Sequence, residues 1–205
     1  AGVTETYGSN YIYLTNIVHV AAGENHVLAL DQWGSVYAWG SNNSGQLGNG
    51  RDSNGAADTM KLVPIRSGVN NVVSIAAGGN SSAAIRKDGT VWVWGDNSYG
   101  QLDIQPNRQA KSSTPIQVQV PVYAEQVDVS DSHMIVLGEN GAVYGWGRNN
   151  NGQLGIGSVS DVQVGMVTPS VMKDGTAYAL DGTTDITGDG IGNRVLAVAA
   201  GAMHS

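Results

Sequence analysis

The chain has 205 residues, of which 13% are charged, and its formal net charge is −7. Its ten lysine and arginine residues are scattered, which argues against a nucleic-acid groove, because such grooves need clustered basic side chains to displace counterions from phosphates. The lack of cysteine excludes disulfides and thiolate chemistry. No apolar run approaches the roughly 20 residues of a membrane-spanning helix.

Residues 1–16 precede the first recognisable repeat. The segment Tyr7–Leu14 is rich in aromatic and β-branched residues, which favours a strand. We expect this strand to belong to a preceding sheet or to pair with the last one.

A tryptophan–glycine pair then recurs at Trp39, Trp94 and Trp146, followed each time by a Gly-Gln-Leu segment. The period of about fifty residues is typical of proteins built from repeated structural units. Each unit reads as strand, strand, hairpin turn and strand. Small residues such as Ala21-Ala22-Gly23 place the first strand of the unit at a crowded inner edge.

Two further features describe the turn and the last strand of each unit. Asp88-Gly89 and Asn140-Gly141 predict two-residue hairpin turns in which both central residues have positive φ. A proline after each Gly-Gln-Leu segment marks an outer strand, where a missing backbone N–H is tolerated. These prolines are Pro64, Pro115 and Pro169.

Side chains in the third strand of each unit alternate, yet both faces of the strand are apolar. Each small sheet must therefore be covered on both sides by its neighbours, as in a β-propeller. We predict an all-β fold, a propeller portion of three complete four-stranded blades plus the start of a fourth. The expected division is an N-terminal strand at 1–16, blade repeats at 17–66, 67–121 and 122–172, an inserted loop at 173–194, and the start of blade repeat 4 at 195–205.

Three blades are fewer than the four to eight of a closed ring. We expect the chain to be part of a larger ring, because a broken blade would expose unpaired strand edges. The alternative is a ring closed by another subunit.

The tryptophans divide into two groups. Those on the alternating face are expected in the core: Trp39, Trp92, Trp94 and Trp146. Trp33 instead lies in a turn where the other units carry Asp88 and Asn140. We expect Trp33 to be exposed and take it as a candidate contact residue.

His26, His133 and His204 occupy equivalent positions in their units, where the second unit has Ser81. Equivalent positions are spread around a ring, whereas a zinc site needs three or four converging ligands, so the structural role is favoured over a ligand or catalytic one. We expect each to link neighbouring strands through its ring nitrogens. The Gly-Gln-Leu turns are also structural, since they lack the lysine of a phosphate-binding loop.

Oxygen-bearing residues gather in the insertion before the fourth unit. Asp185, Thr187 and Asp189 alternate ahead of Gly190, as in the first half of a calcium-binding loop, and Asp181 could supply a further oxygen. Leu196 stands where a bidentate carboxylate is expected. The segment is either a calcium site or a solvated acidic loop, and no other cofactor is expected.

Three coincident motifs, Ala-Ala-Gly with a following His, Gly-x-Val-Tyr-x-Trp-Gly, and Asn-x-x-Gly-Gln-Leu-Gly, resemble the regulator of chromosome condensation repeat family, in a bacterial type of member. The resemblance covers roughly residues 17–155 and 195–205 and implies blades of a seven-bladed propeller. It implies a binding scaffold, since relatives include an exchange factor for a small GTPase, a plant UV-B photoreceptor and ubiquitin-ligase domains. None of their functional residues carries over to this chain.

We find no catalytic constellation and expect no enzyme. The first hypothesis is a protein–protein interaction module, extracellular or at the cell surface, that binds a protein through rim loops at 49–63, 104–114 and 156–193. The second is a regulator of a small GTPase that acts as a guanine-nucleotide exchange factor. The third is a calcium-dependent structural or glycan-binding module of the cell surface.

Overall fold

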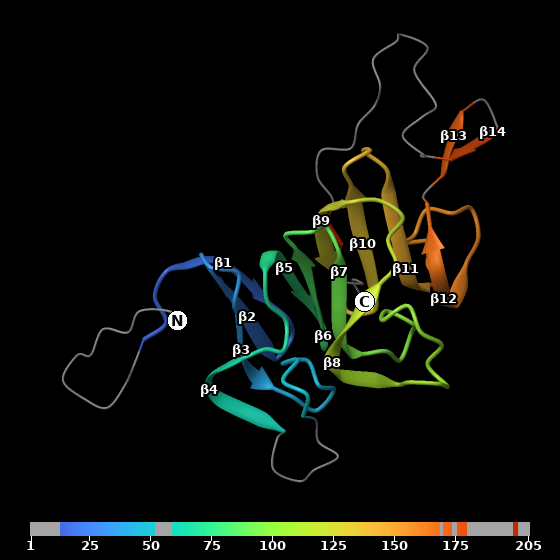
Figure 1. Ribbon diagram of the computed structural model, residues 1–205. Coiled ribbons are helices and arrows are strands. Elements are labelled where there is room, and N and C mark those ends of the chain that lie inside the picture. Colours follow the sequence, from blue (N-terminus) through green and yellow to red (C-terminus); the bar gives the residue numbers. More distant parts are fainter. Residues whose placement is uncertain (1–12, 52–58, 169, 174–175, 180–198, 201–205) are drawn as a thin grey trace.

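The computed structural model describes residues 13–51, 59–168, 170–173, 176–179 and 199–200. Three four-stranded antiparallel sheets lie side by side like spokes (Figure 1). The predicted all-β propeller portion is thereby confirmed. No helix in the described part of the chain could span a membrane.

Each sheet is formed by consecutive strands, with the first strand at one edge and the fourth at the other. The first blade contains β1 (Ile17–Ala22), β2 (His26–Asp31), β3 (Val36–Ser41) and β4 (Met60–Arg66). The second contains β5 (Val72–Gly78), β6 (Ser81–Arg86), β7 (Val91–Asp96) and β8 (Lys111–Val118). The third contains β9 (Ala124–Val129), β10 (His133–Gly138), β11 (Val143–Asn149) and β12 (Ser160–Val167).

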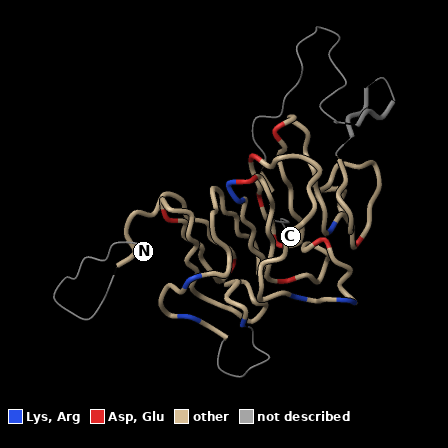
Figure 2. Tube along the Cα trace, viewed as in Figure 1, with Lys and Arg blue, Asp and Glu red and all other residues tan. Residues whose placement is uncertain are grey.

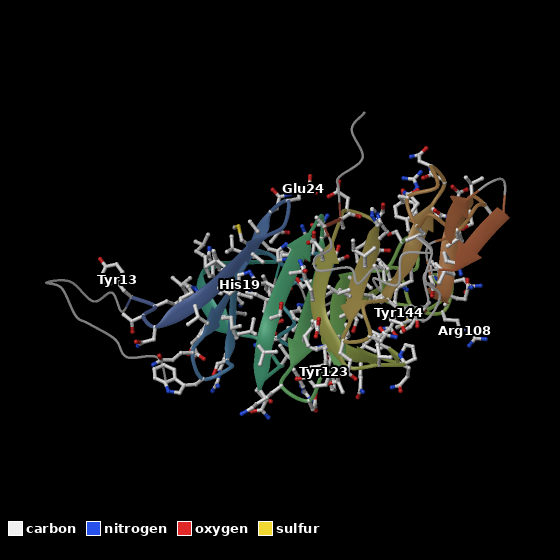
Figure 3. All side chains as sticks on the ribbon, turned by 90° about the horizontal axis from the view of Figure 1, so that it is seen from above. Tyr13, His19, Glu24, Arg108, Tyr123 and Tyr144 are labelled. Atoms are coloured by element: carbon white, nitrogen blue, oxygen red, sulfur yellow. The ribbon has the colours of Figure 1, made fainter. Side chains whose placement is uncertain are left out.

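The first strands β1, β5 and β9 form the inner wall of the arc (Figure 3). Their alanines and glycines permit the close approach of the blades there, as the sequence predicts. Pro64 and Pro115 lie in the edge strands β4 and β8, while Pro169 is outside the described residues.

The hairpin between the second and third strands differs from the predicted two-residue turn. The Gly89 amide donates to the Arg86 carbonyl at 2.9 Å, and the Arg86 amide donates to Thr90 at 3.0 Å. Only the glycine has positive φ, +77° at Gly89, while Asp88 does not. The loop therefore has three residues, a type I turn followed by a left-handed glycine. The same two hydrogen bonds recur in the first and third blades.

The reason for this turn lies in the residue after the glycine. The Asp88 carboxylate accepts hydrogen bonds from the Thr90 amide at 3.1 Å and the Thr90 hydroxyl at 2.6 Å. In the third blade, Asn140 Oδ1 accepts from the Ala142 amide at 3.0 Å. These side-chain bonds stabilise the longer loop.

The core consists of two hydrophobic clusters, each between neighbouring blades. Trp94 is fully buried in the cluster between the first and second blades, and Trp146 in the one between the second and third. Burial of such large side chains contributes a few kcal/mol each. The apolar character of both sheet faces is thus explained by the neighbouring blades.

The prediction that Trp39 is a core residue is wrong. Trp39 is partly exposed and belongs to neither cluster. Its face of the first sheet points away from the second blade, and no described blade packs against that face. Trp92 is also only partly buried, although it packs against the core.

The ends of the chain add two differences. Of the predicted N-terminal strand only Tyr13 and Leu14 are described, and they are not in a strand; β1 is the first element of the described residues. After the third blade a two-stranded hairpin follows, β13 (Ser170–Lys173) and β14 (Thr176–Ala179). β13 lies mostly in the range expected for blade repeat 3, and β14 lies in the predicted loop 173–194. Residues 180–198 are not described, so the remainder of the predicted loop is untested.

Candidate protein-binding surface

The repeated polar side chains connect one blade to the next. The indole N–H of Trp94 donates to the Gln46 carbonyl of the preceding blade at 2.8 Å, and Trp146 donates to Gln101 at 2.8 Å. The Ser82 hydroxyl donates to the same Gln46 carbonyl at 2.9 Å. These indole and hydroxyl groups are therefore occupied inside the fold.

The asparagine that follows each tryptophan–glycine pair holds its loop. Oδ1 of Asn42 accepts from the Leu47 amide at 3.1 Å, closing the Gly-Gln-Leu turn. Its Nδ2 donates to the Arg51 carbonyl at 2.8 Å, further along the same loop. Asn97 and Asn149 make the same two kinds of hydrogen bond in their blades. This role was not predicted, although the recurrence of the asparagine was its signal.

Two of the three predicted histidines, His26 and His133, are described, and both lie in structural positions. Nε2 of His26 is 2.8 Å from Ser82 Oγ in the next blade. Because the Ser82 hydroxyl donates its proton to the Gln46 carbonyl, the His26 ring donates to Ser82 through Nε2. Burial lowers the pKa of His26 to about 4. His204 is outside the described residues.

His133 makes its contact within its own blade. Nδ1 is 2.6 Å from Ser130 Oγ, across the turn between β9 and β10. Burial lowers the His133 pKa, and the nearby carboxylates of Asp128 and Asp131 partly offset this. At the equivalent position, the Ser81 hydroxyl donates to the Asp96 carbonyl at 3.1 Å.

The arc has two rims, one at each end of the strands. We call the end with the β2–β3, β6–β7 and β10–β11 turns the hairpin rim. We call the other end, with the loops between third and fourth strands, the loop rim. Figure 3 shows Tyr123 and Glu24 on opposite edges of the row of blades, Tyr123 at the hairpin rim and Glu24 at the loop rim.

Trp33 lies on the hairpin rim and is 49% exposed. Its backbone is fixed by the Asp31 carboxylate, which accepts from the Trp33 amide at 3.0 Å and the Ser35 amide at 2.8 Å. The indole is thus presented to solvent on a rigid turn, in the exposed position that the sequence predicts. A second exposed aromatic, Tyr123, lies on the same rim and was not predicted.

The rim loops 49–63, 104–114 and 156–193 fall at the loop rim as far as they are described. Residues 52–58 are not described, and β4 occupies the end of the first range. Arg108 in the second loop is exposed. Lys111 Nζ, at the end of that loop, donates to the Asn43 carbonyl at 3.1 Å and so ties it to the first blade.

A shallow hollow of about 430 Å³ follows the inner wall. Polar side chains along it include His19, Ser74 and Gln126, one from each blade, and Asp128 accepts a hydrogen bond from the Ala200 amide at 2.6 Å. Most of the other lining residues are small or aliphatic.

Charges do not gather into a basic surface. Lysine and arginine residues are dispersed over the described trace (Figure 2). The described residues contain no group of three or more side chains that could hold a metal ion. The predicted calcium ligands Asp181, Asp185, Thr187 and Asp189 are outside the described residues.

Comparison with known proteins identifies the family of these repeats. Profiles of the regulator of chromosome condensation (RCC1) repeat match residues 17–46, 72–101 and 124–153, and a second profile of the same repeat matches 34–85, 88–137 and 140–205. The matched residues cover all three blades.

Individual relatives agree with the profiles. The mouse regulator of chromosome condensation is 33% identical over 145 residues, 69% of this chain and 33% of its own length. The ultraviolet-B receptor UVR8 of Arabidopsis thaliana is 32% identical over 161 residues, 77% of this chain and 35% of its own. This chain therefore spans about a third of the length of either relative.

The crystal structure of Prp20p from Saccharomyces cerevisiae, described with its binding properties to Gsp1p and histones, is 26% identical. The match has a TM-score of 0.66 and covers 76% of this chain and 38% of the yeast protein.

Proposed function

Because this chain belongs to the regulator of chromosome condensation repeat family, we propose that it is a non-catalytic protein-binding module built on a propeller scaffold. Relatives of the same architecture support the proposal, since the yeast protein Prp20p binds Gsp1p and histones. Fold alone does not decide function, so the surface residues of this chain must carry the argument.

One observation carries the proposal. At the central position of the hairpin turn the three blades share a backbone framework but differ in the exposed residue, which is Trp33, Asp88 or Asn140. The side chains that recur between blades, such as Trp94 and Trp146, are occupied by hydrogen bonds inside the fold. A rigid frame with variable exposed positions is the arrangement of a binding scaffold.

We propose that the main docking surface is the hairpin rim. The rim loops at 49–63, 104–114 and 156–193 have a secondary role in binding. Trp33 and Tyr123 on the hairpin rim are 49% and 43% exposed. Large aromatic side chains with fixed positions are the residues that contribute most to protein–protein binding. An exposed aromatic on a rigid turn loses little conformational entropy when a partner covers it.

Affinity capture from cells of the source organism tests this function with two variants and the wild-type chain as bait. We expect the wild type to retain a reproducible partner that the Trp33→Ser variant loses. The Glu24→Ser variant, which changes an exposed residue of the β1–β2 turn outside the three rim loops, serves as the control and retains it. The proposal would be contradicted if the Trp33→Ser variant captured the same partner as the wild type. It would also be contradicted if no captured protein bound the purified chain directly.

A second candidate function is nucleotide exchange on a small GTPase. It is favoured by the likeness to Prp20p, which binds Gsp1p. Release of a labelled guanine nucleotide from purified Gsp1p tests it. A rate increase with this chain would support exchange activity, and an unchanged rate would leave the binding module as the function of the chain.

A further inference from the structure

A hollow of about 360 Å³ opens on the hairpin rim between the second and third blades. Its apolar side is formed by the end of β8 and the connection after it, including Val118, Val120 and Pro121. Asp88, Tyr123 and Glu139 also line it, from the hairpin of the second blade, the connection, and the hairpin of the third.

Tyr123 is held in a fixed position in this hollow. Its hydroxyl donates to the Lys87 carbonyl at 2.8 Å, across the boundary between the two blades. Its ring lies over Gly89, where a Cβ atom would fall on the ring. The ring is nevertheless 43% exposed. A fixed and exposed aromatic ring is suited to attract a cation to its face.

The hollow carries two negative charges. Hydrogen bonds from Thr90 hold the Asp88 pKa below its ordinary value, with a smaller contribution from the charge of Arg86, so this carboxylate is ionised at neutral pH. Both Thr90 bonds go to Oδ1, and within the described residues no bond to Oδ2 is made. Glu139 is exposed, and its carboxylate has no hydrogen-bond or ion-pair partner in the same described residues.

No lysine or arginine lines the hollow to neutralise these carboxylates. Lys87 is exposed on the same turn but is not part of the lining, and Arg86 lies with its guanidinium carbon 3.8 Å from the centre of the Trp92 ring. The hollow therefore combines two carboxylates, an aromatic ring and an apolar wall.

We propose that this hollow binds an arginine side chain of the protein partner. A guanidinium group pairs with carboxylates in a planar geometry and stacks on aromatic rings, which a lysine ammonium does less well. The apolar wall suits the methylene groups of the same side chain. This inference rests on the proposed protein-binding function and names the chemistry that the partner presents.

Titration of the 15N-labelled chain with the peptide Gly-Ser-Arg-Ser-Gly, followed by NMR at low salt, tests the proposal. The backbone signals of Gly89, Tyr123 and Glu139 should shift, and a peptide with citrulline in place of arginine should bind at least about tenfold more weakly, because it lacks the charge. Raising the salt concentration should weaken the binding of the arginine peptide but not that of the citrulline peptide.

Two double variants separate the site from general electrostatics. The double variant Asp88→Asn with Glu139→Gln removes both charges of the hollow and should lower the affinity for the arginine peptide about tenfold. Glu24→Gln with Asp161→Asn removes two exposed charges elsewhere and should weaken it less than about twofold. Thermal unfolding of each variant confirms that it folds.

Equal weakening by both double variants, shifts confined to other residues, or no binding of the arginine peptide would overturn the arginine site. Loss of the arginine site would not by itself refute the proposed protein-binding function. A partner captured by the wild type and lost with Trp33→Ser would still support protein binding.

Discussion

His26 has a buried ring between the first and second blades, with no hydrogen-bond partner for Nδ1 among the described residues. Burial lowers the pKa of His26 from 6.5 to about 4. Protonation in the unfolded chain begins near the higher value, so the unfolded state binds more protons between these two pH values. The stability contributed by neutral His26 is thus present above pH 6.5 and is lost as the pH falls towards 4.

We predict that the free energy of unfolding decreases by about 2 kcal/mol between pH 7 and pH 5 through His26 alone. The lowered pKa of His133 adds to the decrease in the same direction. Urea unfolding at several pH values measures it, and the His26→Gln variant, which does not titrate, should show a flatter dependence. Identical slopes for wild type and variant would show that His26 is not the group responsible.

Trp94 and Trp39 occupy equivalent positions in their blades but have different surroundings. Replacing Trp94 with Phe removes the bond to the Gln46 carbonyl and leaves a gap in the core, so it should cost about 1–3 kcal/mol. The Trp39→Phe change, on the partly exposed face, should cost less than about 1 kcal/mol. Chemical denaturation of the two variants gives the comparison. Trp94 packs against one face of the first blade, and Trp39 lies on the opposite face. Equal losses of stability in the two variants would contradict the difference in packing between these two faces.

At the scale of elements, the hairpin turns position both the blades and the rim. The Gly89 carbonyl accepts from the Ala124 amide of the third blade at 3.1 Å, and Gly34 accepts from Val72 of the second at 3.0 Å. Each turn therefore sets the position of the next inner strand. This explains why Tyr123, one residue before Ala124, lies on the turn of the preceding blade.

Alanine in place of Gly89 should destabilise the protein more than alanine in place of Gly152. Both glycines have left-handed backbone, with φ of +77° and +72°, so each substitution costs about 1 kcal/mol in strain. At Gly89 the added methyl also falls on the Tyr123 ring, whereas nothing lies within 4 Å at Gly152. Thermal unfolding should show an additional loss of about 1–3 kcal/mol for Gly89→Ala. A loss no larger than that of Gly152→Ala would contradict the packing of Tyr123.

The sequence predicted the strands better than their connections. Alternating apolar residues and the Trp-Gly motif are local signals, and they placed the first three strands of each blade. The outer strands were expected at the prolines; Pro64 and Pro115 do lie in β4 and β8, but β12 ends at Val167, before Pro169. The two-residue turn was wrong because Asp88-Gly89 suits two turn types, and the bonds from Thr90 decide between them. Tyr123 and Glu139 could not be paired from the sequence, since their proximity depends on how two blades stack.

At the scale of the whole molecule, the three blades form one stacked unit with a shared set of cross-blade bonds. Trp39 shows the limit of reasoning from repeats, because an equivalent position is buried only where a neighbouring blade covers it. The repeat pattern predicted the same core environment for all three tryptophans. Stability in such arrays depends on nearest-neighbour interfaces, and each of the two described interfaces contains one of the hydrophobic clusters.

Hydrogen exchange of the five tryptophan indole protons, measured by NMR and assigned with single Trp→Phe variants, tests the stacking of the blades most directly. The bonds to Gln46 and Gln101 predict slow exchange at Trp94 and Trp146, fast exchange at exposed Trp33, and faster exchange at Trp39 than at Trp94. Exchange at Trp94 and Trp146 as fast as at Trp33 would contradict the stacked blades and, with them, the rigid rim on which the proposed binding depends.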